Sequence, residues 1–219
     1  MRRFFKITLL FLFICISTVA LYGALGYFDA LGDSAALRQR ANTILSENRG
    51  GASLGADRYR QILLVQDPNF EHHNGVDVTT PGAGLTTISQ SLAKRVGFKQ
   101  FKPGIRKIRQ TGYAFGLEQE LSKKQIMALW LDTLEMGQGP DGWLTGFHHA
   151  SEIVYGLQPA ELDDDQFLTL VAVIIAPSRY NLHAQDAALK QRVERISRLV
   201  AGSCSALSNS DVWLEGCRE

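Results

Sequence analysis

An almost unbroken apolar run extends from Ile7 to Phe28 and follows a short basic segment that contains Arg2, Arg3 and Lys6. Twenty-odd apolar residues suffice to cross roughly 30 Å of hydrocarbon as a helix. The preceding positive charges favour a cytoplasmic N-terminus. We therefore predict that residues 1–28 form a signal-anchor transmembrane helix that crosses the cytoplasmic (inner) membrane once, with the domain in the periplasm or on the outer face.

A cleaved signal peptide is the alternative interpretation of the same run. The apolar region of a signal peptide is usually about 7–15 residues long and ends at a small-x-small cleavage site. Here the run is longer, and residues 20–26 contain only weak candidates for such a site. The domain is exported under either interpretation.

Beyond residue 28 the apolar spacing is that of helices, and no strand-like alternation of useful length occurs. Residues 29–56 are predicted to hold a linker and a first helix over 35–45. Ser122 and Gln125 form a capping box that predicts the start of a further helix. Other helices are expected over 86–96, 105–121, 167–176 and 185–200. Residues 57–202 are therefore predicted to form a mostly α, and by this pattern all-α, domain.

A polar tail over residues 203–219 contains Cys204 and Cys217. In an oxidising compartment these two thiols can close a short loop, which would contribute on the order of 3 kcal/mol against fraying. If export fails, two free thiols are the expected state. No pair of cysteines has the spacing of metal ligands.

Charge is unevenly distributed along the chain. Between Asp77 and Glu118 there is no acidic residue, although the segment contains seven basic ones: Lys94, Arg95, Lys99, Lys102, Arg106, Lys107 and Arg109. Such a segment is often only a solvated basic face. Here it also carries neutral hydrogen-bonding groups, namely Thr86, Thr87, Ser89 and Gln90. The combination suits an anionic, polyhydroxylated ligand such as a sugar pyrophosphate, whereas an exported domain rarely meets nucleic acid.

The segment Gln66-Asp-Pro-Asn-Phe-Glu-His-His-Asn-Gly75 resembles the first signature of glycosyltransferase family 51, E-D-x-x-F-x-x-H-x-G. Members of that family polymerise lipid II into glycan strands. Further segments resemble its later motifs in the same order, at residues 84–95, 106–110, 123–137, 146–156 and 176–181. The resemblance covers about residues 57–182. It implies a lysozyme-like, two-lobed, mostly helical fold beside the membrane, with an extended groove for a lipid-linked sugar.

The resemblance also implies where catalysis would take place. In the family, the glutamate of the first motif is thought to act as general base, and the glutamate of the third motif is thought to assist. Gln66 and Gln110 occupy these two positions. A carboxamide preserves shape and hydrogen bonding but cannot take up a proton, and general-base help is worth roughly 10²–10⁴-fold. We therefore expect a catalytically degenerate protein that still binds lipid II or nascent glycan.

We expect the remaining motif residues to form the binding site. Asp67 follows the first catalytic position and has a structural role in the family. The predicted substrate-binding residues are His73, Thr87, Gln90, Lys94, Arg106, Lys107 and Arg109. Departures from the family pattern occur at Ser91, Arg95 and Asp132, and the interval from Asp77 to Gly84 is short.

Two alternative functions stay open. An active monofunctional transglycosylase would need a relocated base, for which Asp67, Glu71 and Glu118 are the candidates. A membrane-anchored scaffold would recruit other cell-wall synthesis proteins without binding a sugar. The adjacent pairs His72-His73 and His148-His149 do not favour a metal site, because neighbouring histidines rarely bind one ion together. No cofactor is otherwise indicated, although family members often use a divalent cation, which makes Mg²⁺ at the pyrophosphate compatible with the resemblance.

Overall fold

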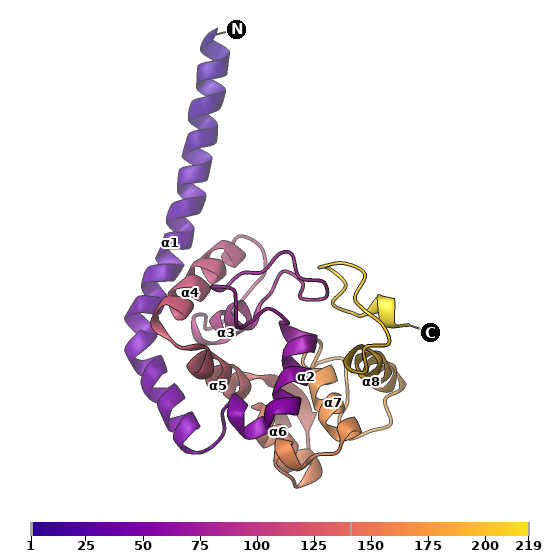
Figure 1. The fold of residues 1–219 in the computed structure, drawn as a ribbon. Coiled ribbons are helices and arrows are strands. Elements are labelled where there is room, and N and C mark those ends of the chain that lie inside the picture. The colour runs from indigo at the N-terminus through magenta and orange to yellow at the C-terminus, as the bar shows by residue number, and fades with distance from the viewer. Residues whose placement is uncertain (1, 141, 219) are drawn as a thin grey trace.

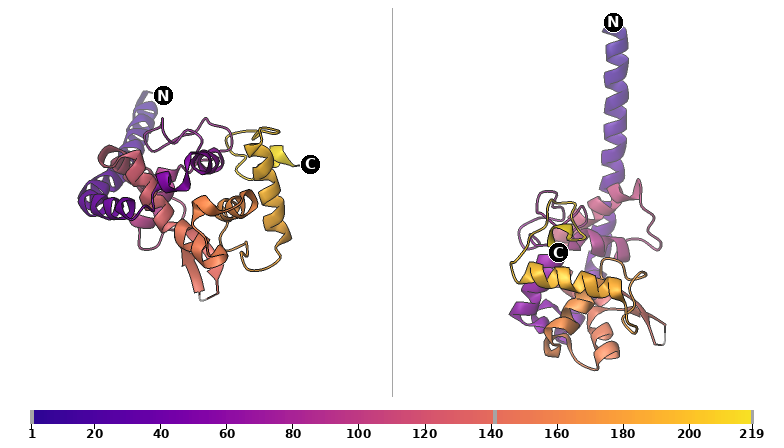
Figure 2. Two further views of the ribbon diagram at one scale, coloured as in Figure 1. Left: turned by 60° about the horizontal axis from the view of Figure 1, so that its bottom comes forward. Right: turned by 90° about the vertical axis from the view of Figure 1, so that its right-hand side faces the viewer.

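The apolar run forms the first half of one long helix, α1 (Arg2–Ser46). The structure is a computed structural model that describes residues 2–140 and 142–218. The N-terminal half of α1 stands clear of the other elements (Figures 1 and 2), and its large apolar side chains are exposed. By length and composition this helix can cross a membrane. In a core helix, burial against other elements would account for so many apolar residues. Here these residues are exposed, so burial within the protein does not account for them.

The second half of α1 packs along α4 (Arg106–Glu120). Glycines allow the two backbones to approach closely: a Cβ atom added at Gly112 would lie 1.9 Å from the carbonyl oxygen of Gly23. Polar pairs continue the contact, since Arg109 binds Asp29 at 2.6 Å and the Tyr113 hydroxyl donates to Asp33 at 2.7 Å.

The linker predicted within residues 29–56 is therefore wrong for its first part, because α1 continues through Asp29 without a break to Ser46. Asp29 and Asp33, which lie in this part, are partners of α4. The later part of that segment forms a 3₁₀ turn, η1 (Gly51–Leu54), and α2 begins at Ala56.

Three helices complete the lobe beside α1. They are α3 (Ile88–Val96), α4 and α5 (Lys123–Thr133). Both α3 and α5 begin with a capping box. Thr87 and Gln90 form the one at α3, and Ser122 and Gln125 form the one at α5, which the sequence predicted. Apolar residues at helical spacing, including Ile88, Leu92, Ile126, Leu129 and Trp130, form the core between them. The predicted helices of this lobe are confirmed to within one or two residues.

The second lobe contains α2 (Ala56–Gln66), α6 (Phe147–Tyr155), η2 (Pro159–Glu161), α7 (Asp164–Val173) and α8 (Ala187–Val200). A short antiparallel hairpin, β1 (Glu135–Gly139) and β2 (Gly142–Thr145), joins α5 to α6. The expectation of an all-α domain is wrong at this hairpin, whose strands are too short and too rich in glycine to show an alternating pattern. The mostly α, lysozyme-like fold with an N-terminal apolar helix is confirmed.

The chain after α8 folds back over the loop that precedes α3. We call residues 203–217 the tail strap; it ends in a 3₁₀ turn, η3 (Glu215–Cys217). Cys204 and Cys217 form a disulfide with Cα atoms 5.3 Å apart. Gly82 and Gly84 donate backbone N–H groups to the carbonyls of Ser208 and Asn209 at 2.9 and 2.8 Å. The strap thereby covers the segment in which the interval between the first two motifs is short (Figure 1).

Candidate functional site

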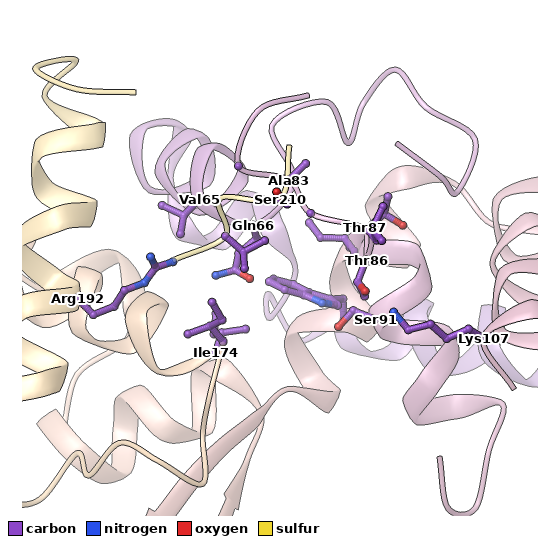
Figure 3. Close-up of a pocket in the computed structure, with 17 residues that line it drawn as sticks. Val65, Gln66, Ala83, Thr86, Thr87, Ser91, Lys107, Ile174, Arg192 and Ser210 are labelled. Atoms are coloured by element: carbon purple, nitrogen blue, oxygen red, sulfur yellow. The ribbon is translucent and has the colours of Figure 1, made fainter. Parts of the chain in front are cut away.

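A pocket of about 460 Å³ lies where α2 ends and α3 begins. We call it the Gln66 pocket, because Gln66 is the last residue of α2 and lines it. Figure 3 shows side chains converging on it from both lobes and from the tail strap. Its lining includes Val65, Thr86, Ser91, Lys107, Trp130, Ile174, Arg192, Ser210 and Val212. Two lobes that meet around a cavity are a usual setting for a ligand site.

A second pocket, of about 840 Å³, lies between α3, α4 and β1. We call it the Gln110 pocket after the residue of α4 that lines it. It shares Thr86 and Lys107 with the Gln66 pocket, so the two pockets adjoin. Its lining is strongly basic and includes Arg40, Lys94, Arg95, Lys99 and Lys107. The structure therefore brings both substituted positions to one continuous region and places a concentration of cations beside the second.

The two glutamine amides donate hydrogen bonds to backbone carbonyls. Gln110 is 3% exposed, and its Nε2 lies 2.7 Å from the carbonyl oxygen of Gln90. Nε2 of Gln66 lies 3.4 Å from the carbonyl oxygen of Val171. An ionised carboxylate has no proton to donate and would repel such a carbonyl. The surroundings of residue 110, and more weakly those of residue 66, are thus suited to an amide.

Asp67 is wholly buried and holds the first motif against α3. Its carboxylate contacts Nε2 of His73 at 2.9 Å and accepts the backbone N–H of Ile88 at 2.8 Å. The Ile88 N–H is one of the unpaired donors at the start of α3, where a carboxylate is favoured. The hydrogen-bonding capacity of the Asp67 carboxylate is used in these contacts, and neither Asp67 nor His73 lines the Gln66 or the Gln110 pocket, so both residues have a structural place in the fold.

The other two candidates for a relocated base are also engaged. Glu71 accepts a hydrogen bond of 2.6 Å from the Tyr59 hydroxyl, whose pKa is raised by burial and by that bond. Glu118 binds Nζ of Lys123 at 2.8 Å and accepts the Ser89 hydroxyl. Neither carboxylate lines the Gln66 or the Gln110 pocket.

Apart from His73, the predicted substrate-binding residues divide into two groups. Lys107 lines both pockets, Lys94 lines the Gln110 pocket, and Thr87 lines the Gln66 pocket. The Thr87 hydroxyl donates a hydrogen bond to the carbonyl of Gly75 at 2.7 Å. Burial, and then the nearby charge of Arg95, lower the pKa of Lys94.

Gln90, Arg106 and Arg109 make contacts within the protein. The Gln90 amide donates to the Thr111 hydroxyl at 3.0 Å, and Arg106 donates to the carbonyl of Gln100 at 2.7 Å. Arg109 is paired with Asp29. These three residues are not among those that line the two pockets. Their predicted role in binding stays a prediction.

Arg192 and Glu135 are pocket residues that the sequence patterns missed. Arg192 lies on α8 between Leu189 and Ile196, and it shares their buried face. The only signal in the sequence was an arginine at an apolar position of an amphipathic helix. Glu135 is exposed and is the one acidic side chain among the residues that line these two pockets.

Within the described residues, no group of three or more His, Cys, Asp or Glu side chains is placed to hold a metal ion. A Mg²⁺ ion bound chiefly by a ligand's own phosphates would need few protein ligands. Its presence at the pyrophosphate stays a prediction.

The family profile described as "Transglycosylase" matches residues 52–201, which include Gln66, Gln110 and most of the residues that line the two pockets. The chain belongs to the transglycosylase family. It is 29% identical over 154 residues to the "Biosynthetic peptidoglycan transglycosylase" of Nitrosomonas eutropha, covering 64% of this chain and 62% of that protein. It is 28% identical over 157 residues to the protein of the same name from Acinetobacter baumannii, covering 65% and 68%.

A longer relative matches as well. "Penicillin-binding protein 1A" of Aquifex aeolicus is 30% identical over 153 residues, which cover 64% of this chain and 20% of that protein. The transglycosylase-family chain thus spans less than two thirds of the Nitrosomonas protein and one fifth of the Aquifex protein. The tail strap follows the residues that match the family profile.

Proposed function

We propose that this protein is a membrane-anchored transglycosylase-family member that binds lipid II or a nascent glycan strand without polymerising it. Its domain lies in the periplasm or on the outer face of the cytoplasmic membrane, where it acts with other cell-wall synthesis proteins. The names of the relatives support a ligand from peptidoglycan synthesis. The apolar half of α1 supports the anchoring, and the basic residues before it support the orientation.

The observation that carries the proposal is the chemistry of Gln66 and Gln110. Glycan polymerisation requires a group that removes a proton from the attacking sugar hydroxyl, and an amide cannot do so near neutral pH. The amide of Gln110 is moreover held by a hydrogen bond that an ionised glutamate could not make. The adjacent or nearby carboxylates Asp67, Glu71 and Glu118 are engaged in contacts within the fold.

The basic side chains of the Gln110 pocket support binding of a pyrophosphate. Lys94, Arg95 and Lys107 line this pocket together, and the nearest contacts of Arg95 are neutral hydroxyls, of Thr133 at 3.0 Å and Ser91 at 2.9 Å. Burial lowers the pKa of Arg95 to about 10, which leaves it charged at neutral pH. A partly buried set of cations is a favourable place for a phosphate group.

Glu135 favours one alternative function, that of an active transferase with a relocated base. This carboxylate lines the Gln110 pocket together with Lys94 and accepts a hydrogen bond from the Trp143 indole. If it were the base, the wild-type protein would polymerise lipid II and Glu135→Gln would lower the rate by roughly 10²–10⁴-fold.

Fluorescent lipid II added to the full chain in detergent tests the proposal. The wild type is expected to bind it and to form no polymer, and Lys94→Ala with Lys107→Ala is expected to weaken binding. Lys190→Ala, an exposed cation on α8, is the control and should leave binding unchanged. Polymer formation that Glu135→Gln abolishes would establish the alternative. Absence of both binding and polymer would contradict the proposal and point to a scaffold.

A further inference from the structure

The guanidinium of Arg192 is buried without a hydrogen-bond partner at two of its three nitrogens. The residue is 4% exposed, and both Nε and Nη1 make no hydrogen bond among the described residues. Figure 3 shows its side chain reaching from α8 into the Gln66 pocket, on the side where Gln66 and Ile174 lie. Burying an unpaired charge is costly, and folded proteins normally avoid it.

The carboxylates near Arg192 are used elsewhere. Asp211 accepts backbone N–H groups of the tail strap, from Leu207 at 3.0 Å and from Glu215 at 2.7 Å. The Glu215 side chain is bound to Arg195 at 2.9 Å and to Arg218 at 2.6 Å. Burial accordingly lowers the pKa of Arg192 to about 10, and at neutral pH it keeps its charge.

A second unpaired donor lines the same pocket. Trp130 is 1% exposed, and its indole N–H has no acceptor in the part of the chain that the structure describes. The residues that line the pocket include no acid, and Gln66 stands where the family motif has a glutamate. Two buried donors, one of them a cation, therefore share a cavity whose lining offers no anion to them. A ligand that places an oxygen anion at Arg192 and an acceptor at the Trp130 indole would satisfy both.

We propose that Arg192 forms an oxyanion subsite in the Gln66 pocket that takes a carboxylate of the bound ligand, with the Trp130 indole as a further donor to the same ligand. This deepens the proposed function, on which it rests, by naming a second charged group that the protein recognises. One planar guanidinium matches one carboxylate in a bidentate arrangement. The walls beside it are apolar, from Val65, Ile174 and Val212. A doubly charged pyrophosphate is better matched to the several cations of the Gln110 pocket.

The tail strap closes the subsite toward one end. Ser210 and Val212 of the strap line the pocket, and the strap is bound to the loop before α3 through Asn209, whose Nδ2 donates to the carbonyl of Thr80 at 2.9 Å. Exclusion of water strengthens an ion pair at Arg192. The disulfide joins the two ends of the strap.

Affinity for fluorescent lipid II, measured on the full chain in detergent, provides the first test. Arg192→Gln is expected to weaken binding by roughly tenfold or more, and Arg192→Lys by less, because lysine retains the charge and loses the bidentate geometry. Lys190→Gln on the same helix is the matched control and should bind as the wild type does. Gln66→Glu places a competing carboxylate in the pocket and should also weaken binding. A melting temperature for Arg192→Gln no lower than that of the wild type shows that the variant folds.

A titration with muramyl pentapeptide, which carries free peptide carboxylates as lipid II does, is followed through the assigned NMR signal of the Trp130 indole N–H and tests the subsite without lipid II. The signal should shift in the wild type and stay unchanged in Arg192→Gln. Inorganic pyrophosphate is expected to cause no shift; a shift by pyrophosphate alone would overturn the assignment to a carboxylate. If Arg192→Gln binds lipid II as tightly as the wild type, the subsite is wrong while the proposed function stands. If the wild type binds no lipid II, the proposed function fails, and the indole titration alone decides the subsite.

Discussion

Replacing Gln110 by glutamate tests whether the contact between α3 and α4 is adapted to an amide. The side chain is 3% exposed and its Nε2 donates to the carbonyl oxygen of Gln90 at 2.7 Å. An ionised glutamate loses this donor and places a negative oxygen against the carbonyl. Loss of a buried hydrogen bond and an unsatisfied group together cost about 2 kcal/mol. The cations of the Gln110 pocket offset part of this cost, but they act across solvent, whereas the carbonyl is in direct contact.

The expected result is a melting temperature roughly 4–8 °C lower than that of the wild type at pH 8, since 1 kcal/mol corresponds to about 2–4 °C in a domain of this size. The loss should depend on pH. A protonated glutamate can donate to the carbonyl, so the folded-state pKa of Glu at this position lies above the unfolded value of about 4.3. The penalty is therefore absent below the unfolded pKa and grows as the pH rises through the folded pKa.

Gln119→Glu is the matched control, because it makes the same chemical change at an exposed position of the same helix. It should change the melting temperature by less than about 1 °C, in keeping with the small effect of most surface substitutions. Equal melting temperatures for Gln110→Glu and the wild type at pH 8 would refute the adaptation of this site to an amide.

Three further substitutions probe the fold around the site. Asp67→Ala leaves the Ile88 N–H and His73 without their buried partner, and should lower the free energy of unfolding by about 3 kcal/mol in chemical denaturation; a loss below 1 kcal/mol would contradict the structural role. Cys204→Ser with Cys217→Ser should cost about 3 kcal/mol in thermal unfolding relative to the disulfide-bonded wild type, and the reduced wild type should match the variant. Gly112→Ala places a Cβ atom 1.9 Å from the Gly23 carbonyl oxygen and should separate α1 from α4, which would increase protease cleavage of α1. Gly32→Ala is the control: a Cβ atom there has nothing within 4 Å, and cleavage should stay as in the wild type.

The sequence patterns predicted what depends on local spacing. The apolar positions of α3 and α5 lie in the core, and the Ser122–Gln125 capping box begins α5. Residues 29–34 were predicted to be linker, but they continue α1, where Asp29 and Asp33 pair with residues of α4. Those partners are about eighty positions away along the chain, and no periodicity reveals them.

The sequence located the two substituted positions more readily than their surroundings. Gln66 and Gln110 were identified through the resemblance to the family motifs, and both line the adjoining pockets. Arg109 belongs to the same motif as Gln110, yet it turns to Asp29 on α1, because successive helical positions face different directions. Arg192 was missed because its importance depends on the absence of a partner, which only the packed structure shows.

The first joining step tests the central claim most directly. Labelled lipid II is kept in excess over the wild-type protein, because one molecule must act as donor and a second as acceptor, and the appearance of the first joined product measures whether one sugar is joined to another. With the Nitrosomonas transglycosylase as positive control, the account predicts that the wild type retains bound, unjoined lipid II throughout the interval in which the control consumes it. Glycan chains formed by the wild type at a rate comparable to the control would contradict it.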